Sequence, residues 1–541
     1  MIRFTAILFI VISISLNAQT FQWVDTAELN VQFNPTYLRA AVTLDDSANP
    51  IYARLIKFKE IYSSTYYGNV EIKKVTPSAE HIWADTLFGG VDIKQIITDS
   101  ENNIICLGSY TDTVRIGDSS LTRIGSGISS FLLKLDHQGN FIWLKDGSEF
   151  VPEFTEITLL TNTGSTNFIL GIGSYSVVTN ILTINSSGSI INNIEQLNTG
   201  TISDIEVDIY NNIWSTGFTF SGSVSFNGLD TIAPFDYNDY VVKYDATGEA
   251  KWISFIKDIT VQDFKIESDD SGFIYLSGNL FDSTDFGNLH THGPQWNYDY
   301  FITKIDQDGN YLWVNEIPLG NNQGDATVGN GDYLSCAKNG DIYLAGFFRG
   351  QIDFGNGVEV SSSGVGNYDV LVLKYNKNGE IQLAKTAGGD LYDHGSGIAS
   401  DNKGNFYLTG LIQSNTVFDT INVFANDNSV FVGKVGLNNV VSVDDEYPGN
   451  NSVIKTFELQ QNYPNPFNPT TKISWQSSVS SWQSLKIYDV LGNEVATLIN
   501  EEKSVGNYEV EFDASKFSSG VYFYILKAGD FTQLRKMILL K

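Results

Sequence analysis

An all-β fold is predicted by the composition, by a repeated strand pattern and by the scarcity of helix-forming runs. Glycine accounts for 48 of 541 residues and aromatic residues for 13%, and Val, Ile and Thr are abundant. Aromatic and β-branched residues favour strands, whereas glycine favours tight turns. A chain of this length exceeds one small core, so we expect a large repeat domain and at least one further domain.

Residues 1–18 are predicted to be a signal peptide. Arg3 precedes an apolar run from Phe4 to Leu16, and Ala18 is a small residue suited to cleavage. The run is shorter than the about 20 apolar residues that span a membrane, and no later stretch reaches that length. We therefore expect an exported protein with no transmembrane segment after cleavage of the signal.

The net charge and the number of cysteines indicate which partners and which covalent cross-links the chain can have. With 33 basic and 62 acidic residues, the formal net charge is −29. Such a surface repels phosphate backbones, so we expect no nucleic-acid partner. The two cysteines, Cys106 and Cys336, exclude a disulfide framework and fall in different repeats. Stability must therefore come from packing.

A repeated pair of strands organises residues 19–443. Each copy joins an alternating apolar strand to a second strand through a polar turn, as in FITKIDQDGNYLWVN (301–315). In the four strongest copies a lysine marks the first strand, a glycine follows five residues later, and a tryptophan or leucine follows nine residues later. The anchor positions are residues 74, 134, 183, 243, 304, 374 and 434.

These repeats predict a seven-bladed β-propeller. A second glycine-containing element, such as DIYLAGFFRG (341–350), precedes the stronger anchors, which gives four strands in about 60 residues. Sheets packed face to face around an axis bury both faces. A linear solenoid is the alternative, but its units are usually shorter and need capping repeats. Phe21 to Thr26 resembles the outer strands and is predicted to complete the last blade, unless residues 440–443 supply that strand.

The repeated turn residues have a structural interpretation. Asp136, Asp245 and Asp306 are each followed three residues later by glycine, which suits hairpin turns that need a positive φ. The loop IDQDGN (305–310) faintly resembles a calcium loop, but it lacks the further acidic ligands and the terminal glutamate. The repeated tryptophans are interpreted as packing between blades.

No catalytic or cofactor-binding constellation is recognised in the sequence. There is no nucleophile elbow, no HExxH and no phosphate loop, so we expect no cofactor and no metal. His290 and His292 form an alternating pair that can chelate zinc. Because no Cys or carboxylate stands at ligand spacing, a surface loop is favoured.

The segment GNYDVLVLKYNKNGEIQLAKTAGG (366–389), with FGNG (354–357) before it, resembles the bacterial β-propeller repeat family called SBBP. The resemblance covers most of residues 90–435. It implies an extracellular propeller and implies no reaction.

A second domain is predicted at residues 456–541, after a polar linker at 444–455. Polar and apolar side chains alternate over about seven short strands, which predicts an immunoglobulin-like β-sandwich. Pro464, Pro466 and Pro469 cannot donate ladder hydrogen bonds, so they fit an edge or a connecting segment.

The motifs NYPNPFNPTT, IYDVLGNEV, GVY (520–522) and KMILLK occur in this order at the chain end. Together they closely resemble the type A C-terminal sorting domain of the type IX secretion system. The resemblance implies export through the type IX machinery, removal by a sortase-like peptidase, and release or attachment at the outer cell surface. A fibronectin-like accessory module is the alternative. The motif residues are Asn462, Tyr463, Pro464, Asn465, Pro466, Asn468, Pro469, Gly520, Tyr522, Lys536 and Lys541.

Two classes of function remain for the propeller. The first is a non-enzymatic surface protein whose loops bind a glycan or a protein. The second is a polysaccharide-degrading hydrolase or lyase with its site at the propeller mouth. Near-identical blades without a divergent acidic loop favour the binding protein, whereas carboxylates that converge in one pocket would favour the enzyme.

Overall fold

The structure is a computed structural model of the chain. It describes residues 19–437 and 458–540, except residues 30–39, 63–64, 124–126, 152–155, 174–177, 258–263, 296, 321, 364–365, 414, 426–427, 460–461, 463–464, 478–480, 491–492, 504–505 and 529–530. The signal peptide, the linker and the alternative outer strand at 440–443 lie outside the described residues, as do Tyr463, Pro464 and Lys541. The chain divides into two compact units, Met1–Asn439 and Val440–Lys541.

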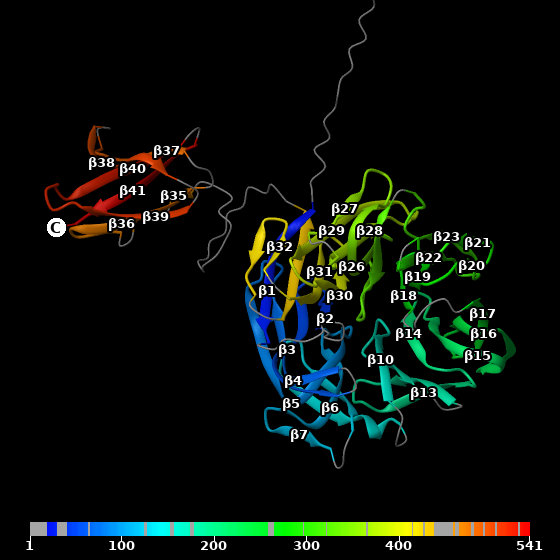
Figure 1. The fold of residues 1–541 in the computed structure, drawn as a ribbon. Coiled ribbons are helices and arrows are strands. Elements are labelled where there is room, and N and C mark those ends of the chain that lie inside the picture. The colour runs from blue at the N-terminus through cyan, green and yellow to red at the C-terminus, as the bar shows by residue number, and fades with distance from the viewer. Residues whose placement is uncertain are drawn as a thin grey trace, which may run out of the picture. The chain divides into compact units, whose positions relative to one another are not determined.

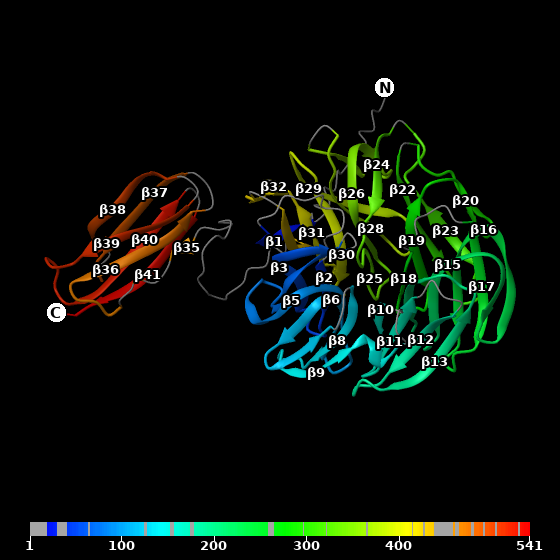
Figure 2. The same cartoon turned by 60° about the horizontal axis from the view of Figure 1, so that its bottom comes forward.

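The first unit consists of antiparallel sheets that follow one another around a centre, a propeller-like arrangement (Figure 1). Figure 2 shows the earliest strands beside the latest ones. An all-β fold is therefore confirmed. Among the described residues, no helix has the length and the apolar character needed to cross a membrane.

Most strands of this unit run in chain order from sheet to sheet. The first eight-stranded sheet contains β2 (Ala40–Leu44), β3 (Pro50–Tyr62), β4 (Thr65–Val75), β5 (His81–Thr98), β6 (Ile104–Ile116), β7 (Ser119–Thr122), β8 (Ser129–Leu135) and β9 (Phe141–Asp146). A short 3-10 turn, Gly147–Glu149, follows. The second contains β10 (Glu156–Asn162), β11 (Phe168–Gly173), β12 (Val178–Ile184), β13 (Ile190–Leu197), β14 (Ile202–Val207), β15 (Ile213–Phe226), β16 (Leu229–Tyr244) and β17 (Ala250–Lys257).

The remaining sheets of the unit are smaller or carry short hairpins. A four-stranded sheet contains β18 (Lys265–Ser268), β19 (Ile274–Leu280), β22 (Asp299–Ile305) and β23 (Tyr311–Asn315), beside the hairpin of β20 (Thr284–Phe286) and β21 (Leu289–Thr291). The third eight-stranded sheet contains β24 (Gln323–Val328), β25 (Leu334–Cys336), β26 (Ile342–Asp353), β27 (Glu359–Ser361), β28 (Asp369–Tyr375), β29 (Ile381–Gly389), β32 (Thr416–Phe418) and β33 (Ile421–Val423). The last sheet contains β30 (His394–Ser400), β31 (Phe406–Ile412), β34 (Ser429–Leu437) and β1 (Gln19–Glu28).

The first strand of the described chain completes the last sheet. β1 pairs antiparallel with β34, from Gln19 opposite Leu437 to Glu28 opposite Ser429. On its other side β34 pairs with β31, so β1 is the outer strand. The prediction that Phe21 to Thr26 completes the last blade is therefore confirmed.

Tryptophans on the outer strands dock most of the sheets onto the next one. Trp313 Nε1 donates to the Lys377 carbonyl at 3.4 Å, in a turn of the following sheet. Trp23 on β1 donates to the Pro77 carbonyl at 3.0 Å, and so joins the last sheet to the first. The interpretation of the repeated tryptophans as packing between sheets is confirmed.

The turn glycines make this docking possible. Gly139, Gly248 and Gly309 have φ values of +86°, +87° and +88°, which confirms the predicted hairpin turns. At Gly309 a Cβ would also lie 2.2 Å from Nε1 of Trp252 on the preceding sheet. Glycine is therefore required both for the backbone conformation and for the close approach of the indole ring.

Some of the anchor lysines form ion pairs with aspartates in neighbouring turns. Lys134 Nζ lies 2.9 Å from Asp99 Oδ2, with 3% and 0% of the two side chains exposed, and Lys74 repeats the pair with Asp45 at 2.9 Å. Burial alone would raise the pKa of Asp99, but hydrogen bonds from Lys134 and Asn103 outweigh it and hold that pKa below its usual value. A buried pair of this kind loses stability when one partner is removed.

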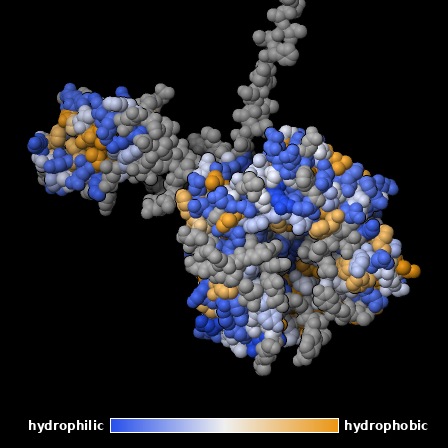
Figure 3. Space-filling model, viewed as in Figure 1, coloured by the Kyte–Doolittle hydropathy of each residue, from blue (hydrophilic) through white to orange (hydrophobic). Residues whose placement is uncertain are grey.

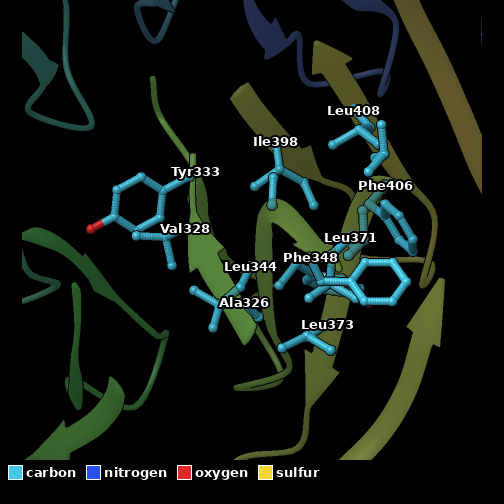
Figure 4. Packing of buried hydrophobic residues seen from close by; sticks show 14 of the residues in the cluster. Ala326, Val328, Tyr333, Leu344, Phe348, Leu371, Leu373, Ile398, Phe406 and Leu408 are labelled. Atoms are coloured by element: carbon cyan, nitrogen blue, oxygen red, sulfur yellow. The ribbon is translucent and has the colours of Figure 1, made fainter. Parts of the chain in front are cut away.

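Apolar side chains fill the space between neighbouring sheets. Figure 4 shows Val328 and Leu344 from one sheet in the same cluster as Ile398 and Phe406 from the next. On the face shown in Figure 3, apolar residues appear as small separate groups in a largely hydrophilic surface. Cys106 and Cys336 are free thiols in separate sheets.

The second unit has two sheets around one core. The smaller sheet contains β35 (Glu458–Leu459), β36 (Thr470–Ser477) and β39 (Gly506–Asp513). The larger sheet contains β37 (Ser481–Tyr488), β38 (Glu494–Lys503), β40 (Gly520–Ala528) and β41 (Phe531–Leu539). Trp475 from one sheet and Leu485 from the other are buried in the shared core.

Candidate functional site

The sorting motif begins with two asparagines that tie its first segment to the sheets. The Asn462 backbone N–H donates to Tyr524 Oη at 2.7 Å, and its side-chain Nδ2 donates to Thr471 Oγ1 at 3.0 Å. Burial raises the pKa of Tyr524 to about 12, although the Asn462 amide acts in the opposite direction. Asn465 Oδ1 accepts from the Ile538 amide at 2.9 Å.

The proline-rich segment lies along the end of β41. The Phe467 N–H donates to the Ile538 carbonyl at 2.9 Å, and the Phe467 carbonyl accepts from the Leu540 amide at 3.0 Å. Pro466 and Pro469 have no N–H to donate, and the backbone pairing with β41 is made by Phe467, one of the two residues between them. The prediction that these prolines occupy an edge segment is confirmed. Phe467, which sequence reasoning did not single out, makes the contact.

The later part of the motif lies on β40 and β41. Gly520 pairs with Leu539, and Tyr522 is buried with its Oη donating to the Ser518 carbonyl at 2.9 Å. The exposed motif residues among those described are Pro466, Asn468, Pro469, Gly520 and Lys536. The structure thus brings Asn462 and residues 465–469 together with β40 and β41, with the buried members holding the fold and the exposed members available to a partner.

The centre of the first unit holds polar side chains from four sheets. Gln95 Nε2 on β5 donates to Asp332 Oδ1 at 3.0 Å, and its Oε1 accepts from the Leu160 amide on β10 at 2.7 Å. Lys265 Nζ on β18 lies 2.9 Å from the same Asp332 oxygen and 3.6 Å from Asp204 Oδ1 on β14. This axial network links strands that are far apart in the sequence.

Burial changes the protonation of the acids in the axial network. It raises the pKa of Asp204 to about 6 against the attraction of Lys265, and raises that of Glu206 to about 8 although Ser268 Oγ donates to it at 2.6 Å. Burial and repulsion from Glu206 and Asp204 also raise the pKa of Glu267 well above its usual value. Glu206 therefore keeps its proton near neutral pH.

Sequence reasoning did not identify these acids. The available signal was a charged residue at every second position of two inner strands, in SDIEVD (203–208) and FKIESD (264–269). Alternation of this kind marks one face of a strand, but it does not show that two such faces meet.

A cavity of about 460 Å³ is lined by the paired strands β29 and β32 and by the loops beside them. Its walls carry hydroxyl, amide and carboxylate groups, and we call it the rim cavity. The lining residues are Ser363, Thr386, Ala387, Gly388, Gly389, Asp390, Asn415, Val417 and Asp419. Lys385 Nζ lies 2.9 Å from Asp419 Oδ1 and offsets part of the negative charge.

Two buried carboxyl groups lie behind the wall of the rim cavity. A Cβ at Gly388 would lie 2.1 Å from Asp369 Cγ, so only glycine allows this carboxyl group to sit so close. Burial raises the pKa of Asp369, and burial with repulsion from Asp369 raises the pKa of Asp393 to about 7. The Ser363 amide donates to Asp369 Oδ2 at 2.5 Å, which connects the cavity wall to this pair.

Two tyrosine side chains lie close to the rim cavity in the sequence, because Tyr392 is two residues from Asp390, which lines it. The rings of Tyr368 and Tyr392 are 6.0 Å apart, and the Arg349 guanidinium lies 4.9 Å from the Tyr368 centroid. Asp325 Oδ2 holds that guanidinium at 2.8 and 3.1 Å. Tyr392 is 43% exposed, and the loop that carries it also supplies Asp390 to the cavity. This arrangement suits a polar ligand that has an apolar face.

Comparison with known families identifies the second unit. Residues 461–540 match the family model described as "Secretion system C-terminal sorting domain". The chain therefore carries a C-terminal sorting domain of the type IX secretion system, and it is secreted or attached to the cell surface. No curated protein matches the sequence.

Solved structures show only a distant likeness. A protein of unknown function from Bacteroides caccae is 11% identical, with 58% of this chain and 89% of that chain covered and a TM-score of 0.31. PorZ, a surface component of the type IX secretion system of Porphyromonas gingivalis, is 10% identical, with 92% and 74% covered and a TM-score of 0.31. A family 43 arabinoxylan arabinofuranohydrolase from Bacillus subtilis is 10% identical, with 93% and 96% covered and a TM-score of 0.27. At these TM-scores no feature of this chain is inferred from them.

Proposed function

We propose that this chain is a non-enzymatic binding protein that the type IX secretion system exports to the cell surface or the medium. The sorting-domain match at residues 461–540 carries the export part of the proposal. In this view residues 1–18 are removed on entry to the periplasm, and the second unit is an immunoglobulin-like sandwich that contacts the type IX machinery. A sortase-like peptidase then removes that unit.

The first unit is proposed to be a closed seven-bladed propeller of the SBBP type. Four-strand meanders follow the anchor spacing, and β1 joins the last of them to the chain start. Trp23 then docks the last meander on the first through the Pro77 carbonyl. A closed ring covers the faces of every sheet and leaves only short edges, which suits a protein that must persist outside the cell.

The rim cavity and the neighbouring tyrosines carry the binding part of the proposal. Hydroxyl, amide and carboxylate groups line the cavity, and the exposed ring of Tyr392 lies on the same loop as Asp390. A pyranose ring combines hydroxyl groups with an apolar C–H face, so a glycan fits this chemistry better than a purely apolar ligand. The ligand proposed is therefore a neutral glycan.

Export is tested by truncation after Ser452 in the native host. We expect the truncated chain to accumulate in the periplasm, because the type IX machinery recognises the sorting domain that the truncation removes. Secretion of the truncated chain at the full-length level would contradict the proposal.

Binding is tested on a glycan array with the chain that begins at residue 19. Tyr392→Ala should weaken binding about tenfold, since an exposed aromatic contact contributes about 1 kcal/mol or more at the centre of an interface. Tyr62→Ala is the matched control, because Tyr62 is equally exposed on another sheet. Equal binding by Tyr392→Ala, or no glycan bound at all, would contradict the proposal.

A polysaccharide hydrolase or lyase is the second candidate. The convergence of Asp204, Glu206 and Glu267 in the axial network favours it, because paired carboxyl groups of different protonation perform such hydrolysis. Against it, Lys265 and the Ile266 amide already engage Asp204, and the Ser268 hydroxyl donates to Glu206. We expect no release of reducing ends from common polysaccharides. Activity that Glu206→Gln abolishes would establish the enzyme instead.

A further inference from the structure

A pair of histidines lies at the end of the β20–β21 hairpin, beside β23 (Figure 1). His290 and His292 are two positions apart on extended chain, so their side chains project from one face. Thr291 between them is buried on the other face. The two imidazole centroids are 5.5 Å apart, and both side chains are 55% exposed.

Each imidazole is held by a carboxylate through Nδ1. His290 Nδ1 lies 2.7 Å from Asp285 Oδ1, directly across the hairpin, and His292 Nδ1 lies 2.9 Å from Glu316 Oε1. Glu316 also accepts from the backbone amides of His292 and Gly293, at 2.9 to 3.0 Å, which fixes its position. Sequence spacing missed both carboxylates because one comes from the facing strand and the other from a later loop.

This hydrogen bonding leaves Nε2 of each ring as the available nitrogen. Each carboxylate accepts a hydrogen bond from the Nδ1–H group. In the neutral imidazole the lone pair that can bind a metal is therefore on Nε2. Within the described part of the chain, neither Nε2 has a hydrogen-bond partner. Histidines that bind metals show the same arrangement, in which the ring N–H that does not face the metal donates a hydrogen bond to a carboxylate.

The separation of the rings fits chelation of one ion. With Zn–N bonds of about 2.0–2.1 Å and a tetrahedral angle, two imidazoles on one ion have centroids about 5 Å apart. The observed 5.5 Å needs only a small side-chain rotation to reach that value. Imidazole nitrogen favours zinc, nickel and copper over the oxygen-seeking magnesium and calcium.

We propose that His290 and His292 form a two-imidazole site for a divalent d-block cation, with Asp285 and Glu316 as positioning residues. Among the described residues, no group of three or more His, Cys, Asp or Glu side chains is arranged to hold an ion. The site therefore has two protein ligands and an open face where water completes the coordination. The sequence-based preference for a plain surface loop is revised here on the geometry of the two carboxylates.

The proposal is tested by calorimetric titration of zinc chloride into the untagged chain that begins at residue 19. Excess magnesium chloride occupies weak carboxylate sites on this acidic protein. We expect one equivalent of Zn²⁺ to bind, and His290→Asn with His292→Asn to weaken that binding at least tenfold. His81→Asn with His137→Asn is the matched control, since both are exposed histidines elsewhere, and it should bind as the parent chain does.

The role of Asp285 and Glu316 is tested separately, by the Zn²⁺ affinity of variants at these two positions. Asp285→Asn with Glu316→Gln should weaken Zn²⁺ binding about 10–100-fold, as loss of such outer carboxylates does in other sites. Glu316→Gln keeps an acceptor oxygen for the backbone amides of His292 and Gly293, so it should bind Zn²⁺ more tightly than Glu316→Ala does. Unchanged binding in the His290→Asn, His292→Asn variant, or no stoichiometric binding by the parent chain, would overturn the proposal.

Discussion

The contact between Gly309 and Trp252 can be measured by substituting a single methyl group. Gly309→Ala introduces a Cβ at φ +88°, only 2.2 Å from Nε1 of Trp252. Gly355→Ala is the matched control, because Gly355 has φ +85° and nothing lies within 4 Å of its Cβ position. The two substitutions share the backbone cost, and they differ in the clash with the neighbouring sheet.

The expected magnitudes follow from these two geometries. A left-handed conformation costs an L-residue about 1–2 kcal/mol in the folded state. Alanine also lowers the conformational entropy of the unfolded chain, which stabilises the folded state by about 0.4–1 kcal/mol. Gly355→Ala should therefore lower the free energy of unfolding by about 1 kcal/mol. Optimal carbon contacts are about 3.5–4.0 Å, so the indole ring must move by more than 1 Å in Gly309→Ala. Overpacking of this kind costs about 1–3 kcal/mol, which gives a total loss of about 2–4 kcal/mol.

The assay is urea unfolding of the chain that begins at residue 19, followed by far-UV circular dichroism. Trp252→Ala supplies the second arm of a double-mutant cycle. In that background Gly309→Ala should cost only about 1 kcal/mol, which leaves a coupling of about 1–3 kcal/mol between the two positions. Equal losses for Gly309→Ala and Gly355→Ala, or no coupling to Trp252, would refute the docking role of this glycine.

Two further predictions concern ring closure and pH. Phe21→Ala removes a buried ring whose centroid lies 5.0 Å from that of Phe418. It should destabilise the first unit by about 3–5 kcal/mol, seen as one cooperative transition in urea. A separate early transition would show that β1 is dispensable. Burial raises the pKa of Asp299 from 3.8 to about 8, against the Ile317 and Tyr300 amides that donate to it. The folded state therefore holds a proton that the unfolded chain loses, and stability falls by about 1.4 kcal/mol per pH unit as pH rises from 3.8 towards 8. Asp299→Asn should remove that slope, so its urea midpoint should change less between pH 5 and pH 8, and an unchanged pH dependence would contradict the assignment.

Features with a local sequence signature could be predicted. A hairpin needs only its own alternating residues and a glycine at positive φ, so the turns at Gly139 and Gly309 follow from a few adjacent letters. The pairing of β1 with β34 was also predictable, because Trp23 carries the outer-strand signature without companion strands before it. The sorting motif was recognisable because its pieces occur in a fixed order at the chain end.

Features that depend on closure of the whole unit could not be predicted in the same way. Gln95 and Asp332 meet in the axial network only because distant sheets face one another, and nothing local to either residue indicates the other. The same holds for Glu316 beside His292 and for Asp369 behind Gly388. Long-range polar contacts of this kind depend on the three-dimensional arrangement, which residue spacing does not encode.

The position of β34 determines how the first unit bears a mechanical load. Residues beyond Leu437 lead to the sorting domain, so a pull on that domain reaches the first unit through the end of β34. An edge strand peels away one hydrogen bond at a time, but β34 is bonded on one side to β31 and on the other to β1. A force applied to the sorting domain is therefore resisted by two hydrogen-bonded ladders together, one of which is made by β1.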